Sequence, residues 1–243
     1  LELDTANLRD ALATDREGVV ALLASTETSS RADLGVVARP SDVEDGEYTV
    51  NVTTAPEVAR VQAGSAMTDT LSAAETLTFS YSANNTEATP TTSNFSVTLQ
   101  AGDSLSQVVD RLNSAFATQG VRLTAFAESN TLTIESTEHG ADMFFSVESL
   151  TASGAGTTRI GTGTLSDAGV DVAGTIGGAT ATGQGDRLEV QGGDLDGLAV
   201  NYTGSDAGLV GTVTLVTGVG TSFVNTVNAL NTGSESVVGA RTA

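Results

Sequence analysis

The sequence of 243 residues contains no cysteine and no tryptophan, and all ten of its basic residues are arginines. Without cysteine the chain has no disulfides, no thiol nucleophile and no thiolate metal site. A single histidine, His139, does not supply the several ligands of a typical zinc site. The core must therefore be built from aliphatic side chains and seven phenylalanines. Together with abundant Thr, Ser and Gly, this composition predicts a folded, β-rich protein and not a disordered one.

Positive charge is scarce, because 30 acidic residues outnumber 10 basic ones and give a formal net charge of −20. Binding to phosphate depends on clustered positive charge, so this surface repels nucleic acid and anionic lipid. The sequence also has no apolar run near the roughly 20 residues that cross a bilayer. We therefore expect neither a nucleic acid nor a membrane partner. A soluble, self-repelling surface and a saline habitat account for the acidity equally well.

Both ends of the sequence are predicted to be helical. Residues 1–24 carry apolar residues at i, i+3 and i+4 from Leu8 onward, and residues 218–232 repeat apolar residues at similar spacing. Two apolar stripes cannot both face water, so we expect these segments to pack as antiparallel helices, with the rest of the chain inserted between them. Since the sequence begins with Leu1 inside a predicted helix, we also expect a fragment of a longer protein.

Between these ends the hydrophobic period changes to two, which is typical of strands. Strands are predicted at residues 33–38, 48–55, 77–82, 95–99, 121–127, 131–136, 143–147, 187–191, 198–204 and 211–218. Residues 25–30 are predicted to be a polar linker, and residues 151–186 a loop-heavy boundary rich in Gly, Thr and Ala. The predicted class is α+β, mainly β, with antiparallel sheets, one packed helix and helical flanking segments.

The most specific local pattern lies in residues 101–147. Asp103 or Ser104 can cap a helix that ends at Gly120, and two of the predicted strands then form a hairpin. The apolar stripe of this helix consists of Leu105, Val108, Val109, Leu112, Ala115 and Phe116. We expect the stripe to pack on the sheet.

These patterns divide the chain into four predicted parts. They are a helical segment at 1–30, a β-rich domain at 31–150, a Gly/Thr-rich linker with a second β-rich region at 151–217, and a helical segment at 218–243 that pairs with the first.

Two glycine-rich stretches raise the question of a ligand site. Residues 178–185, GATATGQG, have the glycine spacing of a phosphate-binding P-loop. They lack its Lys and Ser/Thr, and a strand-like stretch follows instead of a helix. Residues 192–200 contain Asp194 and Asp196 in a pattern similar to a calcium-binding β-roll, but that pattern occurs once and a β-roll needs stacked repeats. We interpret both stretches as turns.

The remaining candidate is His139, which could act as a general base with Glu138 or Asp142. The sequence has no G-x-S-x-G elbow to supply a nucleophile, and a turn residue before Gly140 is the simpler interpretation. Carboxylate pairs of the glycosidase kind stay open, because 30 acids make chance pairs common. We therefore predict no catalytic, cofactor-binding or metal residue, and no enzyme activity.

The unit at 101–147 resembles the short repeat of flagellar hook and hook-associated proteins, in which a G-x-[ST]-L helix precedes two strands. The residues that match in order are Gly102, Leu105, Val109, Leu112, Asn113, Gly120, Val121, Ala125, Leu132, Ile134 and Ser136.

The two ends resemble the flagellar filament-cap family, hook-associated protein 2. The matching residues are Leu3, Asp4, Leu8, Ala11, Leu12, Asp15, Val19 or Val20 and Leu22, and then Gly218, Val219, Phe223, Val227 and Leu230. Arg16 and Leu23 stand where the family prefers Pro and Phe. Residues 174–204 also resemble a glycine-rich stretch of the family, which implies that Gly178, Gly183 and Gly185 are turn glycines of a β-domain.

The resemblance implies a secreted structural protein, extracellular at the distal tip of the bacterial flagellum. Proteins of this family form ring-like oligomers at full length and promote the assembly of flagellin, so flagellin and other axial proteins are the implied partners. No cofactor is implied. Two alternatives stay open, another hook-associated or flagellin-like axial protein and an adhesin-like carbohydrate-binding surface module. The scarcity of aromatic rings weighs against the second, because ring stacking supplies much of the contact with sugars.

Overall fold

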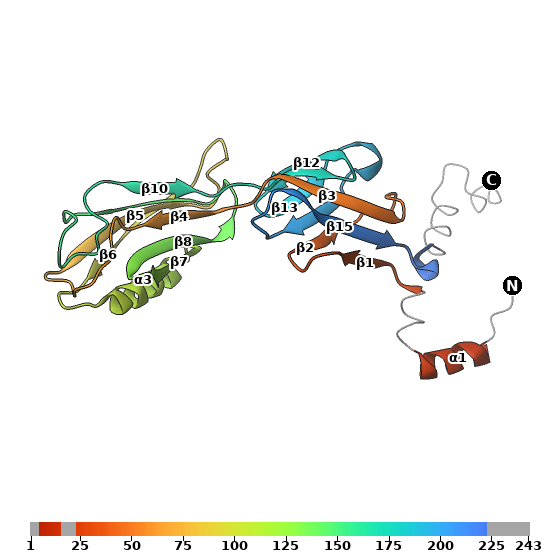
Figure 1. The fold of residues 1–243 in the computed structure, drawn as a ribbon, viewed down its shortest axis with the longest axis horizontal. Coiled ribbons are helices and arrows are strands. Elements are labelled where there is room, and N and C mark those ends of the chain that lie inside the picture. Colours follow the sequence, from red (N-terminus) through yellow and green to blue (C-terminus); the bar gives the residue numbers. More distant parts are fainter. Residues whose placement is uncertain (1–4, 16–22, 223–243) are drawn as a thin grey trace, which may run out of the picture.

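The computed structural model describes residues 5–15 and 23–222, which form two β-rich lobes joined end to end (Figure 1). The proximal lobe consists of residues 26–54 and 171–216, and the distal lobe of residues 57–168. The distal lobe is thus inserted into the proximal one, between two strands that are hydrogen-bonded to each other. A helix, α1 (Thr5–Thr14), precedes the proximal lobe.

The proximal lobe is one antiparallel sheet of eight strands in the order β1-β15-β3-β11-β12-β13-β14-β2. Its elements are β1 (Thr26–Ser29), β2 (Leu34–Ala38), β3 (Gly46–Thr54), β11 (Ala173–Ile176), β12 (Ala179–Gln184), β13 (Arg187–Val190), the 3-10 turn η1 (Gly193–Leu195), β14 (Ala199–Tyr202) and β15 (Gly208–Val216). The two end strands, β1 and β2, contact each other. The sheet therefore curls around one apolar core, with the fully buried Tyr202 and Leu188 inside.

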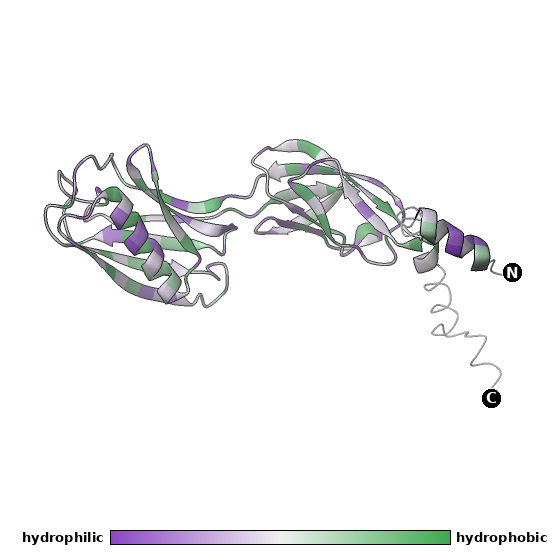
Figure 2. Cartoon of the chain, turned by 90° about the horizontal axis from the view of Figure 1, so that it is seen from below, coloured by the Kyte–Doolittle hydropathy of each residue, from purple (hydrophilic) through white to green (hydrophobic). Residues whose placement is uncertain are grey.

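The distal lobe has two sheets that enclose a second apolar core. The four-stranded sheet has the order β10-β9-β5-β6, and the three-stranded sheet the order β4-β8-β7. The strands are β4 (Val58–Gln62), β5 (Glu75–Ser82), β6 (Thr92–Leu99), β7 (Leu123–Glu128), β8 (Thr131–His139), β9 (Phe144–Ser149) and β10 (Leu165–Ala168). Helix α3 (Leu105–Gln119) packs against β7 and β6, on the outside of the strands (Figure 2).

Local signals account for helix α3, as predicted. The Ser104 hydroxyl accepts a hydrogen bond from the Gln107 N–H, and the Gln107 side chain accepts one from the Ser104 N–H, which completes a capping box. Gly120 ends the helix in the left-handed conformation at φ 65°. On the buried face, Phe116 meets the ring of Phe79 edge-on, with centroids 5.3 Å apart.

The mainly β, antiparallel architecture with one packed helix is confirmed, but several strands escaped prediction. Residues 25–30 were expected to be a linker, yet they include β1, whose four side chains are all exposed and show no alternation. Residues 151–186 contain β10, β11 and β12 in place of a continuous loop. Their small residues allow close backbone packing, since a Cβ on Gly174 would lie 2.2 Å from the carbonyl oxygen of Asn51.

The glycine-rich part that does form a loop, residues 151–163, is anchored by a buried carboxylate. Glu75 is 3% exposed and accepts hydrogen bonds from the hydroxyls of Ser149 (2.6 Å) and Thr158 (2.7 Å) and from the Thr158 N–H (2.8 Å). The two Thr158 donors hold the loop against β5, and the Ser149 hydroxyl, from the end of β9, binds the same carboxylate.

Strand pairing groups the chain differently from the predicted division at residues 150 and 151. Strands β2 and β3 belong with β11–β15, so residues 31–54 share a core with residues 171–216. The predicted pairing of helices at 1–24 and 218–232 lies mostly outside the described residues. Among the described residues, Gly218 packs closely on the backbone of Ala24. A Cβ added to Gly218 would lie 2.4 Å from the Ala24 carbonyl oxygen. The chain therefore enters the proximal lobe at residue 24 and leaves it at residue 218 side by side.

Candidate functional site

The two lobes are connected by two chain crossings that are hydrogen-bonded to each other. The Glu57 N–H donates to the Val170 carbonyl (3.0 Å), and the Val170 N–H donates back to the Glu57 carbonyl (2.9 Å). The Gly140 N–H donates to the same Glu57 carbonyl (3.1 Å). The connection is thus a short antiparallel ribbon with a third segment bound to it, and not a pair of free linkers.

One carboxylate joins the lobes directly. Oδ1 of Asp171 accepts hydrogen bonds from the Ala141 N–H of the distal lobe (3.0 Å) and from the Gly185 N–H of the proximal lobe (2.8 Å). Hydrogen bonds to a charged acceptor are stronger than those between neutral groups. Asp171 therefore links the backbones of the two lobes through a single carboxylate.

Close approach of the backbones at this point requires glycine. A Cβ on Gly140 would lie 2.7 Å from both Gly185 Cα and Asp171 Oδ1, and a Cβ on Gly169 would lie 2.5 Å from the Gly140 carbonyl oxygen. Real Cβ atoms essentially never come this close to other atoms. We call Glu57, Gly140, Gly169, Asp171 and Gly185 together the interlobe joint.

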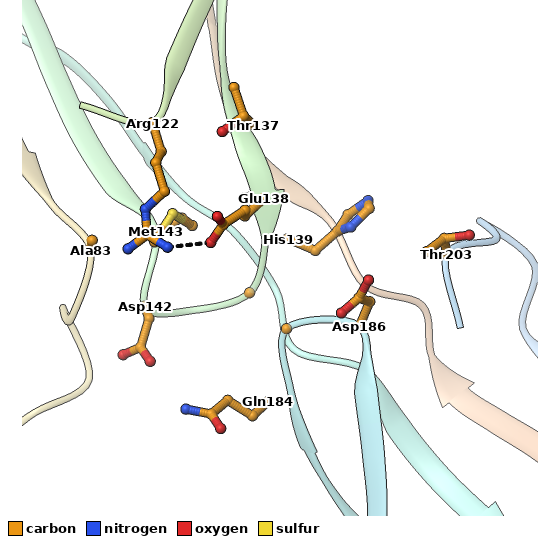
Figure 3. A pocket seen from close by; sticks show the side chains of 12 residues that line it. Ala83, Arg122, Thr137, Glu138, His139, Asp142, Met143, Gln184, Asp186 and Thr203 are labelled. Carbon is orange, nitrogen blue, oxygen red and sulfur yellow. Dashed lines mark hydrogen bonds and ion pairs between the residues drawn. The ribbon is translucent and has the colours of Figure 1, made fainter. Parts of the chain in front are cut away.

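A polar cavity of about 580 Å³ opens beside the joint (Figure 3). The candidate general base His139, the last residue of β8, lines it together with Glu138 and Asp142. Neither carboxylate orients the imidazole, because Glu138 is paired with Arg122 and Asp142 accepts from the Thr86 hydroxyl. The structure therefore does not assemble the histidine–carboxylate pair that the sequence left open.

Asp142 makes a second polar link across the cavity. The Thr86 hydroxyl is the main cause that lowers the pKa of Asp142, while partial burial acts against it. The Thr86 N–H and the side chain of Gln184, in β12, lower this pKa further. The loop that carries Thr86 in the distal lobe and strand β12 of the proximal lobe thus meet at the Asp142 carboxylate.

The stretch GATATGQG is a β-hairpin element and not a phosphate loop. It forms β12, and β13 follows it in antiparallel pairing where a P-loop would open a helix. Gly178 (φ 84°) and Gly185 (φ 62°) lie in turns, as the resemblance implies. Gly183 was expected to be a turn glycine, but it lies inside β12, where an added Cβ would be 1.5 Å from the Val172 carbonyl oxygen. Its role is close packing.

Asp194 and Asp196 lie in the connection between β13 and β14, as predicted for a turn. Oδ1 of Asp196 accepts from the Gly192 N–H at 2.5 Å, so that carboxylate closes the turn. In the described ranges, 5–15 and 23–222, no group of three or more His, Asp or Glu side chains could hold a metal ion. The same ranges contain no helix long and apolar enough to cross a membrane.

We expect no specific stabilisation by Ca²⁺. A site that binds only the folded state would raise the melting temperature in a saturable way, whereas charge screening depends on ionic strength alone. The measurement is thermal unfolding with EDTA, Mg²⁺ or Ca²⁺ at matched ionic strength. A saturable rise with micromolar Ca²⁺ that Asp194→Asn abolishes would contradict the assignment of this segment as a turn.

Removal of the Asp171 carboxylate is expected to loosen the joint. Asp171→Ala leaves the Ala141 and Gly185 N–H groups without their acceptor, at a cost of about 1–3 kcal/mol. Small-angle X-ray scattering should then show a wider distribution of lobe orientations. The matched control is Asp186→Ala, because Asp186 accepts from Asn201 (3.0 Å) within the proximal lobe. Identical scattering from both variants and the parent would show that other contacts set the angle.

The sequence prediction missed most of the joint, although a signal for it exists. Gly140-Ala141-Asp142 and Gly169-Val170-Asp171 share the pattern G-x-D, and Gly185 is followed by Asp186. The first two segments combine a glycine that allows close approach with an aspartate that accepts backbone hydrogen bonds. Nothing in the sequence shows that the three segments meet.

Solved structures of flagellar cap proteins resemble this fold over most of the chain. The D2-D3 domains of the flagellar cap protein FliD from Escherichia coli match with a TM-score of 0.51 and 17% identity, over 81% of this chain and 100% of that chain. The flagellar cap protein FliD from Bdellovibrio bacteriovorus matches with a TM-score of 0.50 and 12% identity, over 78% of this chain and 99% of that chain. At these identities the likeness shows a shared fold alone. No family model and no curated protein match the chain.

Proposed function

We propose that this chain is the two-lobed part of a flagellar filament cap, which acts at the distal tip of the bacterial flagellum and promotes the assembly of flagellin. The observation that carries the proposal is the insertion of one β-lobe into another, with Ala24 and Gly218, just outside the first and last strands of the proximal lobe, side by side. The Escherichia coli cap domains share this fold over their whole length. The hook-type sequence pattern adds support, because its residues form one compact unit of α3, β7 and β8.

The proposal includes an extracellular location, flagellin and other axial proteins as partners, and a ring-like oligomer of the full-length protein. It includes no nucleic acid, membrane, cofactor or catalytic role. A rigid joint suits a part that must hold a fixed shape while other subunits move past it. The joint supplies that rigidity through backbone hydrogen bonds and the Asp171 carboxylate.

The test is deletion of the gene in the bacterium that carries it, followed by complementation with the full-length protein. Without a cap, flagellin should be secreted into the medium and cells should lack filaments. Complementation should restore filaments, and gold-labelled antibodies against residues 26–216 should mark their tips. Normal filaments in the deletion strain, or label along the shaft, would refute the proposal. Gly35→Ala, which adds a methyl group in open space, serves as the control that should complement fully.

A further inference from the structure

Strand β6 forms one edge of the four-stranded sheet and pairs only with β5. Its eight residues, TSNFSVTL, follow β5 without a register shift. In such an edge strand every second residue turns its N–H and C=O away from the sheet. Within residues 5–15 and 23–222, the backbone of β6 makes no hydrogen bond except to β5. β6 therefore presents a regular row of free donors and acceptors.

The other edge strands of the described sheets are shorter and lie against another element. β1 and β2 contact each other, and so do β4 and β10. Helix α3 contacts β7 more extensively than it contacts β6. Proteins usually protect a long edge with a proline, a charge or a bulge. The eight residues of β6 contain no proline and no charged residue, and their pairing with β5 has no bulge.

The lack of charge extends beyond the edge strand. In a chain of net charge −20, no charged residue occurs between Glu87 and Asp103. The outward face of β5 continues this character, because Thr78 is aligned with Ser96 and Ser80 with Asn94. One strand further, β9 places Ser146 beside Ser80 and Glu148 beside Thr78. Strand β6 and the outward face of β5 thus form an uncharged, hydroxyl-rich strip on an acidic molecule.

Helix α3 runs beside β6 but does not fill the space next to the strand. A hollow of about 360 Å³ lies there, lined by Val97, Thr98, Asp110, Arg111 and Ser114. The Arg111 guanidinium is bound to the buried Asp103 at 2.7 Å, at the start of the helix. A further strand therefore has room to approach β6.

We propose that the free edge of β6 pairs with β6 of a second copy of this chain, antiparallel and about a two-fold axis, so that two four-stranded sheets become one. Two chains of charge −20 repel each other over most of their surfaces, and like charges on paired strands destabilise the pairing. The uncharged edge of β6 is therefore a place where a second copy can approach. Two β6 edges meet without that repulsion.

This contact is independent of the flagellar role. A two-fold contact uses the same patch on both copies and closes on itself, so it cannot by itself build a ring. It is therefore separate from any contact that would form a cap oligomer.

The first test is sedimentation equilibrium of the 243-residue chain as a function of concentration and salt. The chain should dimerise, and more strongly at high ionic strength, because salt screens the repulsion elsewhere. Ser96→Glu should raise the dimer dissociation constant about tenfold or more, since it places like charges on the paired edges. Ser166→Glu is the matched control, as it adds the same charge at an exposed position of β10, on the opposite edge of the sheet. Circular dichroism verifies that both variants melt like the parent.

The second test uses the absence of cysteine. Single cysteines at Asn94, Ser96 or Thr98 should give a disulfide-linked dimer on mild oxidation for at least one position, because paired strands bring Cβ atoms within disulfide range. Ser166→Cys should not. A chain that stays monomeric, a dimer weakened equally by both Glu variants, or equal cross-linking from Ser166→Cys would each overturn the proposal.

Discussion

Gly183→Ala is expected to destabilise the proximal lobe by about 3 kcal/mol or more, the upper part of the range for overpacked sites. The added Cβ would lie 1.5 Å from the Val172 carbonyl oxygen and 2.7 Å from its carbon. Relief requires β12 to move away from the segment that leads into the interlobe joint, where the Val172 N–H donates to the Gly185 carbonyl (2.8 Å). The strain therefore cannot be absorbed by one flexible side chain.

The matched control is Gly35→Ala, the same substitution in β2 of the same lobe, where no atom lies within 4 Å of the added Cβ. It should be neutral or slightly stabilising, because alanine restricts the unfolded chain more than glycine does. Urea unfolding followed by circular dichroism and tyrosine fluorescence measures both variants, since the chain has no tryptophan. Equal stability of the two variants would show that β12 can shift freely.

Leu112→Ala should destabilise the distal lobe by about 2–5 kcal/mol, the usual cost of emptying a buried leucine site. Leu112 is 0% exposed and belongs to the core between α3 and the two sheets. Its neighbours along the stripe, Val108 and Phe116, are buried as well, and the Phe116 ring is held by aromatic contacts that limit its collapse into a cavity. Most of the cavity is therefore expected to persist.

Ser114→Ala is the control for this helix, because Ser114 is exposed and its hydroxyl only donates to the Asp110 carbonyl (2.8 Å). Thermal unfolding should separate the two variants clearly. Melting temperatures that are equal for the parent and Leu112→Ala would contradict the burial of the stripe.

Local patterns were sufficient where the stabilising contacts are local. Helix α3 was predicted from its cap, its stripe and Gly120, because each of these signals acts within one or two helical turns. Strands with clear alternation, such as β3 and β5, were predicted because alternation is also a pattern of neighbouring residues. Strand β1 lacks that alternation, and β12 alternates only between small residues and threonine or glutamine, so the pairing with β15, β11 and β13 is what establishes these two strands.

The sequence by itself determined the composition of the core, the acidic surface, the packed helix and the strands that alternate. Only the tertiary structure decided which strands share a sheet, because residues 31–54 pair with partners more than a hundred positions later in the chain. It also created the interlobe joint, where Glu57, Gly140, Asp171 and Gly185 come from four separate segments. The physical reason is that hydrogen bonds and close packing act over a few ångströms in space, whatever the separation along the chain.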